Sequence, residues 1–193
     1  MTDAATVPGD ERLRLFVALL LPEATIGRLV AWQEQEIADV QGVRVLPPDH
    51  LHVTLAFLGS RPASEVGDIA RTVREVAREA RAPALRAYRY RETSRVGMVV
   101  LKEEPLPGDS YAGRANMLAG RLMLRLEELG VYRREYRSWL PHVTVARFRE
   151  PPRLSPPPPD LGTFSPSEVA LYHSVLRPAG AQYEVLESVA LGG

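Results

Sequence analysis

Two periods of hydrophobic positions run along this chain, and they divide it into expected strands and expected helices. Alternation at every second residue, or a short continuous apolar run, is typical of a strand, whereas apolar residues three and four apart are typical of a helix. Strands are predicted at 12–20, 43–46, 52–58, 85–91, 96–101, 142–146, 167–176 and 182–191. Helices are predicted at 23–40, 65–80 and 110–129.

Start and stop signals place several of these boundaries. Gly59 is expected to end its strand, Ser64 to cap the next helix, and Gly130 to close the last helix in the position after its C-cap. Met117 and Leu129 are predicted to belong to the buried stripe of that last helix. Helices between strands, together with hairpins, predict an α+β fold whose strands are not all parallel.

One short motif occurs twice, ninety residues apart. Residues 52–56 read His-Val-Thr-Leu-Ala, and residues 142–146 read His-Val-Thr-Val-Ala. On a strand, each histidine and its threonine share one face, about 6.5–7 Å apart, while the aliphatic residues face the other way. The repeat predicts two pseudo-symmetric lobes in a single domain, 1–193, with a flexible tail at 1–10 and a stiff proline-rich connection at 151–160.

Composition excludes several classes of protein. The formal net charge is +0 and the pI is about 6.9, so coating of nucleic acid through bulk charge is not expected, whereas a local pocket for one nucleic-acid end is compatible. The absence of cysteine excludes disulfides, thiolate metal sites and a thiol nucleophile, and fits a reducing cytoplasm. The apolar run 15–21 is too short to span a membrane, and no signal peptide is recognised.

A pair of histidines that face one another across a cleft suits acid–base chemistry at phosphorus. One imidazole would deprotonate an attacking water or hydroxyl, and the other would protonate the leaving oxygen. Thr54 and Thr144 would donate hydrogen bonds to the non-bridging oxygens, and Arg147 would neutralise their charge. Arg147 lies five residues after His142, so on a regular strand it points away from the imidazole. It must either reach round the end of the strand or be re-aimed by a bulge.

These segments resemble a known family. The first motif with Phe-Leu-Gly at 57–59, and the second with Pro141 before it and Arg147 after it, are similar to the 2H phosphoesterase superfamily. Within it, the chain resembles the RNA 2′,3′-cyclic phosphodiesterases, which are also described as 2′-5′ RNA ligases. The likeness extends to residues 14–18, 130–137, 171–174 and 183–186.

The resemblance implies a fold and an activity. Each lobe would be a mainly antiparallel sheet with helices on the outside, and the active-site cleft between them would need no metal or cofactor. The activity would be hydrolysis of an RNA 2′,3′-cyclic phosphate end, or of a cyclic nucleotide, to a 2′-phosphate. His52 would be the proton donor and His142 the proton acceptor, with Thr54 and Thr144 on the phosphate. A cytoplasmic monomer without a membrane partner is expected.

Other interpretations of the sequence remain. His50 and His52 would form a metal site with His142, but no acidic ligand cluster accompanies them, and His50 is expected to be exposed at the strand start. Residues 108–113 superficially suggest a nucleophile elbow, but a loop and helix cap are favoured because the second glycine comes one place too late. His173, in a late strand, is expected to have a structural role or to lie at the rim of the site. A 2′-5′ RNA ligase and a non-catalytic module that binds RNA ends are the alternative functions.

Overall fold

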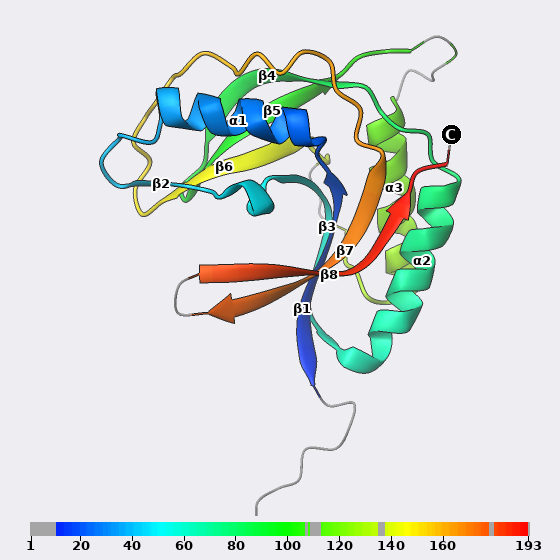
Figure 1. Cartoon of the computed structure of the whole chain (residues 1–193). Helices are drawn as coiled ribbons and strands as arrows, with labels where there is room; N and C mark the ends of the chain where they lie inside the picture. The colour runs from blue at the N-terminus through cyan, green and yellow to red at the C-terminus, as the bar shows by residue number, and fades with distance from the viewer. Residues whose placement is uncertain (1–10, 107, 109–112, 135–137, 178–179, 193) are drawn as a thin grey trace, which may run out of the picture.

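The chain folds around one twisted sheet with helices on a single side (Figure 1). The computed structural model describes residues 11–106, 108, 113–134, 138–177 and 180–192. The strands are β1 (Arg12–Leu20), β2 (Val43–Val45), β3 (His52–Pro62), β4 (Leu85–Glu92), β5 (Val96–Glu103), β6 (His142–Phe148), β7 (Glu168–Arg177) and β8 (Gly180–Ala190). The helices are α1 (Glu23–Glu36), α2 (Val66–Arg78) and α3 (Arg114–Glu128), with short 3₁₀ turns at Pro48–His50 and Ala63–Glu65.

The eight-stranded sheet consists of two halves that meet at one residue pair. The strand order is β4-β5-β6-β3-β1-β7-β8, with β2 also pairing to β6. All pairings between these strands are antiparallel. At the centre, β3 and β6 pair only through Val53 and Val143. The α+β fold with two mainly antiparallel lobes and outer helices is therefore confirmed.

Neither lobe is a continuous piece of chain. The first lobe contains β1, β3, β7 and β8 and is covered by α2 and α3, while the second contains β2, β4, β5 and β6 and is covered by α1 (Figure 1).

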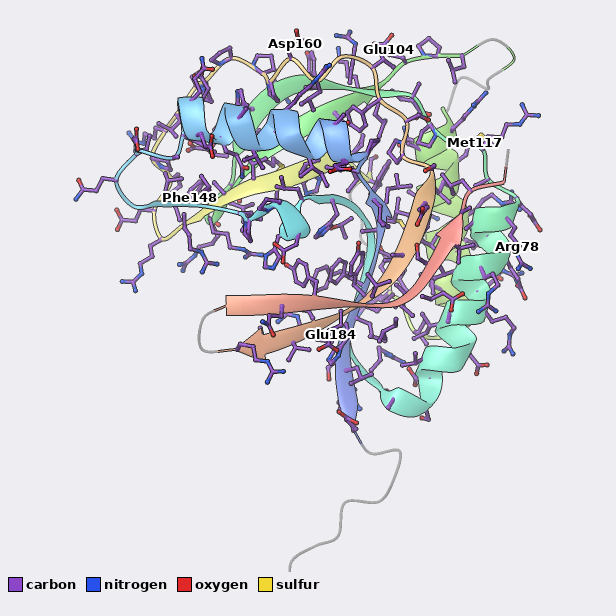
Figure 2. All side chains as sticks on the ribbon, in the orientation of Figure 1. Arg78, Glu104, Met117, Phe148, Asp160 and Glu184 are labelled. Carbon is purple, nitrogen blue, oxygen red and sulfur yellow. The ribbon has the colours of Figure 1, made fainter. Side chains whose placement is uncertain are left out.

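An ion pair joins a helix of the first lobe to its sheet: Arg74 of α2 pairs with Glu187 of β8 at 2.8 Å. Phe148 at the end of β6 and Arg78 at the end of α2 lie on opposite sides of the molecule (Figure 2).

The main core fills the space between the helices and the sheet. Alternate residues of β1 show how the faces divide: Leu15 and Val17 are fully buried in this core. Phe16 and Ala18 face the other way, where they form a second small cluster with Ala170 and Tyr172. The helix-free face of the sheet thus carries its own apolar patch beside the first motif.

Both motif strands contain a β-bulge at the same position. In β3, Ala56 pairs with Val17 but Thr54 pairs with Ala18, so Leu55 is the extra residue. In β6, Ala146 pairs with Gly97 but Thr144 pairs with Met98, so Val145 is the extra residue. The order of buried and partly exposed residues is identical in 52–58 and 142–148. Each bulge shifts the later residues of its strand to the opposite face.

Several predicted boundaries are wrong for physical reasons. The first helix ends at Glu36 and not near residue 40. Gly59 does not end β3: it adopts φ +69° within a second irregularity of the β1–β3 pairing, and the strand continues to Pro62. Ser64 does not cap α2, because it lies inside the 3₁₀ turn that leads into the helix.

The last helix begins at Arg114, and residues 109–112 of the predicted helix lie outside the described residues. Gly130 follows the C-cap with φ +78°, which confirms the predicted helix end. The prediction that Met117 and Leu129 belong to the buried stripe is wrong, since 46% and 38% of their surfaces are exposed. The buried stripe consists of Ala115, Leu118, Ala119, Leu122 and Leu126.

The proline-rich connection runs over the second lobe without regular secondary structure. Trp32 of α1 donates a hydrogen bond to the carbonyl of Pro157 at 2.9 Å. The Glu92 carboxylate accepts hydrogen bonds from the backbone amides of Arg153 and Leu154, both at 2.9 Å. The tail 1–10 lies outside the described residues. None of the helices in the described part of the chain is long and apolar enough to cross a membrane.

Gln33 is the residue through which α1 holds the second motif strand. Its buried side-chain amide donates to the carbonyls of Leu46 (3.0 Å) and of the bulge residue Val145 (2.7 Å). Gln33→Ala should therefore lower the free energy of unfolding by about 2–3 kcal/mol in urea titrations, because it leaves a buried carbonyl without its donor and opens a gap. The matched control is Gln35→Ala on the exposed face of α1, which should change stability little. Equal effects of the two substitutions would contradict this role.

Candidate active site

The four motif side chains lie together on the helix-free face, where β3 and β6 meet. We call them the motif pair: His52 with Thr54, and His142 with Thr144. Val53 and Val143 pair directly and point into the main core, with no exposed surface. Continuing the antiparallel register by one residue in each direction sets each histidine opposite the threonine of the other motif. The structure therefore brings together the two predicted site pairs.

His52 lies in an aromatic enclosure. Its ring centroid is 5.0 Å from that of Phe16 and 5.9 Å from that of Tyr172, both stacked, and 5.6 Å from that of Tyr183, which meets it edge-on. Burial among these rings, followed by the nearby charges of His50 and His142, lowers the pKa of His52 from 6.5 to about 4. Desolvation disfavours the imidazolium, so the free chain holds this ring neutral at pH 7.

His142 is held by a different kind of contact. Its Nδ1 lies 2.8 Å from the carbonyl oxygen of Leu140. A carbonyl only accepts, so Nδ1 carries the hydrogen and Nε2 of the neutral ring offers its lone pair. The backbone of His50, also two residues earlier, partly offsets the lowering of the His52 pKa. Local backbone two residues before each motif histidine thus acts on both rings.

The bulge in β6 resolves the orientation of Arg147. Because Val145 is the extra residue, Val145 and Ala146 are both buried toward the core, and Arg147 emerges on the face of His142 and Thr144. Its charge reaches His52, whose pKa it lowers slightly further. The equivalent residue of the first motif strand is Phe57, which is 50% exposed and stacks on Phe16 at 5.7 Å.

His50 is not exposed as expected. It ends the 3₁₀ turn before β3, its side chain is 13% accessible, and its ring stacks on Tyr183 at 4.3 Å. No group of three or more histidines and acids within the described residues is arranged to hold a metal ion. His173 lies on β7 opposite the core-facing Leu15 and contacts Glu184 at 3.5 Å, away from the motif pair. The glycine-containing segment 108–113 lies mostly outside the described residues.

Sequence reasoning missed several residues around the site. The aromatic enclosure of His52 comes from three strands, and only the β1–β3, β1–β7 and β7–β8 registers bring Phe16, Tyr172 and Tyr183 together. Trp139, just before the second motif, donates a hydrogen bond to the Thr54 carbonyl at 3.0 Å and ties the two motifs to each other.

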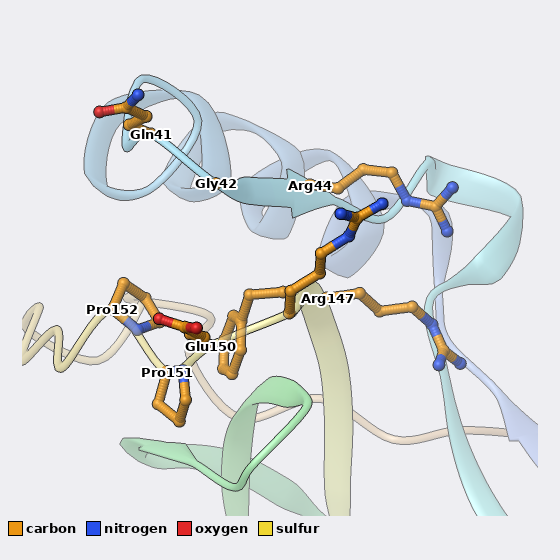
Figure 3. A pocket seen from close by; sticks show the side chains of 9 residues that line it. Gln41, Gly42, Arg44, Arg147, Glu150, Pro151 and Pro152 are labelled. Carbon is orange, nitrogen blue, oxygen red and sulfur yellow. The ribbon is translucent and has the colours of Figure 1, made fainter.

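Arg44 was also missed. It lies directly opposite Arg147 on β2, and both line a hollow of about 850 Å³ at the Phe148 end of β6 (Figure 3). The remaining lining residues are Gln41, Gly42, Phe148, Arg149, Glu150, Pro151 and Pro152. In the sequence, only the alternation of Val43, Arg44 and Val45 signals that Arg44 faces away from the core.

Comparison with known proteins gives consistent matches. A family model described as LigT like Phosphoesterase matches residues 19–96. The chain is 33% identical over 190 residues to the RNA 2′,3′-cyclic phosphodiesterase of Thermus thermophilus, a match that spans 94% of this chain and 91% of that protein. The RNA 2′,3′-cyclic phosphodiesterase of Archaeoglobus fulgidus is 27% identical over 186 residues, spanning 90% of this chain and 98% of that protein.

Solved structures share the fold. A crystal structure of a Thermus thermophilus protein superposes with a TM-score of 0.74 at 30% identity, covering 94% of this chain and 99% of that chain. The crystal structure of Escherichia coli LigT in its apo form gives a TM-score of 0.77 at 24% identity, covering 95% of this chain and 99% of that chain.

The environment of His52 predicts an unusual titration. In an NMR titration its imidazole should titrate near pH 4. Tyr183→Ala should raise this pKa, because it opens one side of the enclosure to water. A His52 signal that titrates near pH 6.5 in both proteins would contradict the enclosure's role.

The same shift predicts how stability varies with pH. Between pH 6.5 and about 4, His52 is protonated in the unfolded chain but stays neutral in the folded chain. The free energy of unfolding therefore falls as the pH falls through this window. This group should lower the free energy of unfolding by about 3 kcal/mol between pH 7 and pH 4. Urea titrations at these two pH values should show this difference in wild type, and the contribution of His52 should be absent in His52→Gln.

Proposed function

The chain belongs to the LigT-like phosphoesterases, the family of the RNA 2′,3′-cyclic phosphodiesterases, and from this membership we propose that it hydrolyses 2′,3′-cyclic phosphate ends of RNA to a 2′-phosphate with two histidines as acid and base. The observation that carries the proposal is the motif pair. His52 and His142 flank a shared face close enough for one charge to affect the other. The substrate is an RNA with a 2′,3′-cyclic phosphate end, or a cyclic nucleotide, and the protein acts as a monomer.

In the proposed reaction, water attacks the cyclic phosphorus from the side of His142. Nε2 of His142 takes the proton from the water as its oxygen bonds to phosphorus, and the bond from phosphorus to the 3′ oxygen breaks. His52 donates a proton to that 3′ oxygen. The products are a 3′-hydroxyl and a 2′-phosphate. The hydrogen bond from Nδ1 of His142 to the Leu140 carbonyl supports the choice of base, because it leaves Nε2 free to accept.

The lowered pKa of His52 gives the donor two properties. A protonated His52 is a strong acid, which favours transfer to an alkoxide leaving group. The free chain holds little of that form at pH 7, so the negative charge of the bound phosphate has to stabilise the imidazolium. Proton donation is therefore coupled to substrate binding, since the anion offsets the desolvation that lowers the pKa.

The remaining groups of this face would hold the phosphate. Thr54 and Thr144 are partly exposed beside the histidines, and their hydroxyls would donate to the non-bridging oxygens. Arg147 adds a positive charge on the same face, which would stabilise the extra negative charge of the transition state. The chain's own side chains thus supply acid, base and anion stabilisation, and the reaction needs no metal.

Ligation would use the same groups. If the 5′-hydroxyl of a second RNA replaced water, His142 would take its proton and the product would be a 2′-5′ linkage. A module that only binds RNA ends has less support, because binding phosphate would require arginine or backbone amides and not two oriented histidines. Product analysis separates the three functions, since a 2′-phosphate, a 2′-5′ linkage and unchanged RNA are different species.

The acid–base roles are tested by removing each histidine. His52→Ala and His142→Ala should each lower kcat on a cyclic phosphate-ended RNA by about 10²–10⁴-fold, while circular dichroism and thermal melting show a folded chain. His173→Ala is the matched control, because this histidine lies on the opposite face of the sheet, and it should keep near wild-type rates. Near wild-type rates in both motif variants would refute the mechanism.

Metal independence is tested by chelation. After dialysis against EDTA, kcat and kcat/KM should be unchanged, and added Mg²⁺, Mn²⁺ or Zn²⁺ should not raise them. Activity that disappears with EDTA and returns with one of these ions would instead assign a metal to the site.

A further inference from the structure

Three arginines line the hollow at the Phe148 end of β6. Arg44 of β2, Arg147 of β6 and Arg149 just after β6 are all exposed, and we name them the arginine cluster. Glu150 is the only acid among the residues that line this hollow. The chain as a whole has a formal net charge of +0, so this excess of positive charge is local.

The arginine cluster contains a like-charged cross-strand pair. Arg44 and Arg147 are direct partners in the antiparallel β2–β6 register, so their side chains share one face (Figure 3). Like charges directly opposite each other destabilise a sheet. Within the described residues, no ion pair joins either guanidinium to a carboxylate. A bound anion would relieve this repulsion, since one phosphate can accept hydrogen bonds from both guanidiniums.

The arginine cluster is continuous with the motif pair. Arg147 lies on the face of Thr144, about 7–10 Å farther along β6. Arg44 extends the positive surface away from His142. Its guanidinium nitrogen lies 3.7 Å from where a Cβ would stand on Gly180, at the start of β8. The Arg44 side chain therefore reaches from the second lobe to the start of β8 in the first lobe.

We propose that the arginine cluster binds the phosphodiester that precedes the cyclic end of an RNA strand, so that the protein acts faster on oligonucleotides than on cyclic mononucleotides. This rests on the proposed function, because the cyclic phosphate must occupy the motif pair. A strand whose end lies there carries its next negative charge one nucleotide away, and a positive groove that follows the backbone is how proteins hold single strands.

The test compares a cyclic mononucleotide with a trinucleotide that ends in a 2′,3′-cyclic phosphate. Wild type should show a higher kcat/KM on the trinucleotide. Arg44→Gln should lower kcat/KM on the trinucleotide roughly five- to tenfold more than on the mononucleotide, and Arg44→Lys should recover most of this loss. Arg81→Gln is the control: Arg81 is exposed and follows the Arg78 end of α2, on the far side of the molecule from β6, so both substrates should be unaffected.

A change in the substrate provides an independent check. A trinucleotide whose last linkage is a neutral methylphosphonate should lose the length preference, and Arg44→Gln should then have little additional effect. The neutral linkage should also weaken the salt dependence of the reaction. In a log–log plot of kcat/KM against salt concentration, the slope should become shallower by about 0.7 for each phosphate contact that is removed.

Two failures are distinguishable. If wild type hydrolyses neither the cyclic mononucleotide nor the trinucleotide, the proposed function is wrong. If it hydrolyses them, but Arg44→Gln affects both substrates equally or neither, then the motif pair is catalytic and the arginine cluster does not bind the strand. An Arg44→Gln effect that persists with the methylphosphonate would also overturn the proposal.

Discussion

The backbone pairing between Val53 and Val143 is the constraint on which the site depends. It is the only pairing between β3 and β6, and both side chains are fully buried in the core. An antiparallel pair has local twofold symmetry, so two copies of one motif that meet at their valines must place their histidines diagonally across the contact. Beyond this pair the strands separate into two lobes, which leaves the histidines and threonines accessible from the helix-free side.

The equivalent scaffolds create two different electrostatic environments. Both motif strands bulge at the same position, yet the residue re-aimed by the bulge is Phe57 in one lobe and Arg147 in the other. The first lobe surrounds its histidine with aromatic rings, and the second places a cation along its strand. Symmetry of the backbone sets the geometry, and the aromatic side chains of the first lobe lower the pKa of His52 by burying it.

Local pattern was enough to predict the elements but not their partners. β1 matches its predicted range in full, since a buried run bounded by polar residues and Pro22 has few other interpretations. The hydrophobic pattern shows which face of an element is buried but not which strands it packs against. The packing of α1 on the second lobe could therefore not be predicted from the sequence. Alanines 56 and 146 are compatible with either face, so the sequence offered a bulge only as one way to re-aim Arg147 and gave no sign of the bulge in β3. The position of Arg44 opposite Arg147 follows only from the β2–β6 register.

The position of Arg147 links the two charged regions of the face. Its positive charge lowers the pKa of His52, adding to the effect of burial, so the site without an anion opposes protonation of His52. A phosphate beside Arg147 would reverse the sign of the local field and favour the imidazolium. An anion held by the arginine cluster would weaken the same repulsion from farther away. Charge carried by the RNA strand, and not only by its reacting end, would then help to protonate His52, which connects recognition of the strand to the proton-transfer step.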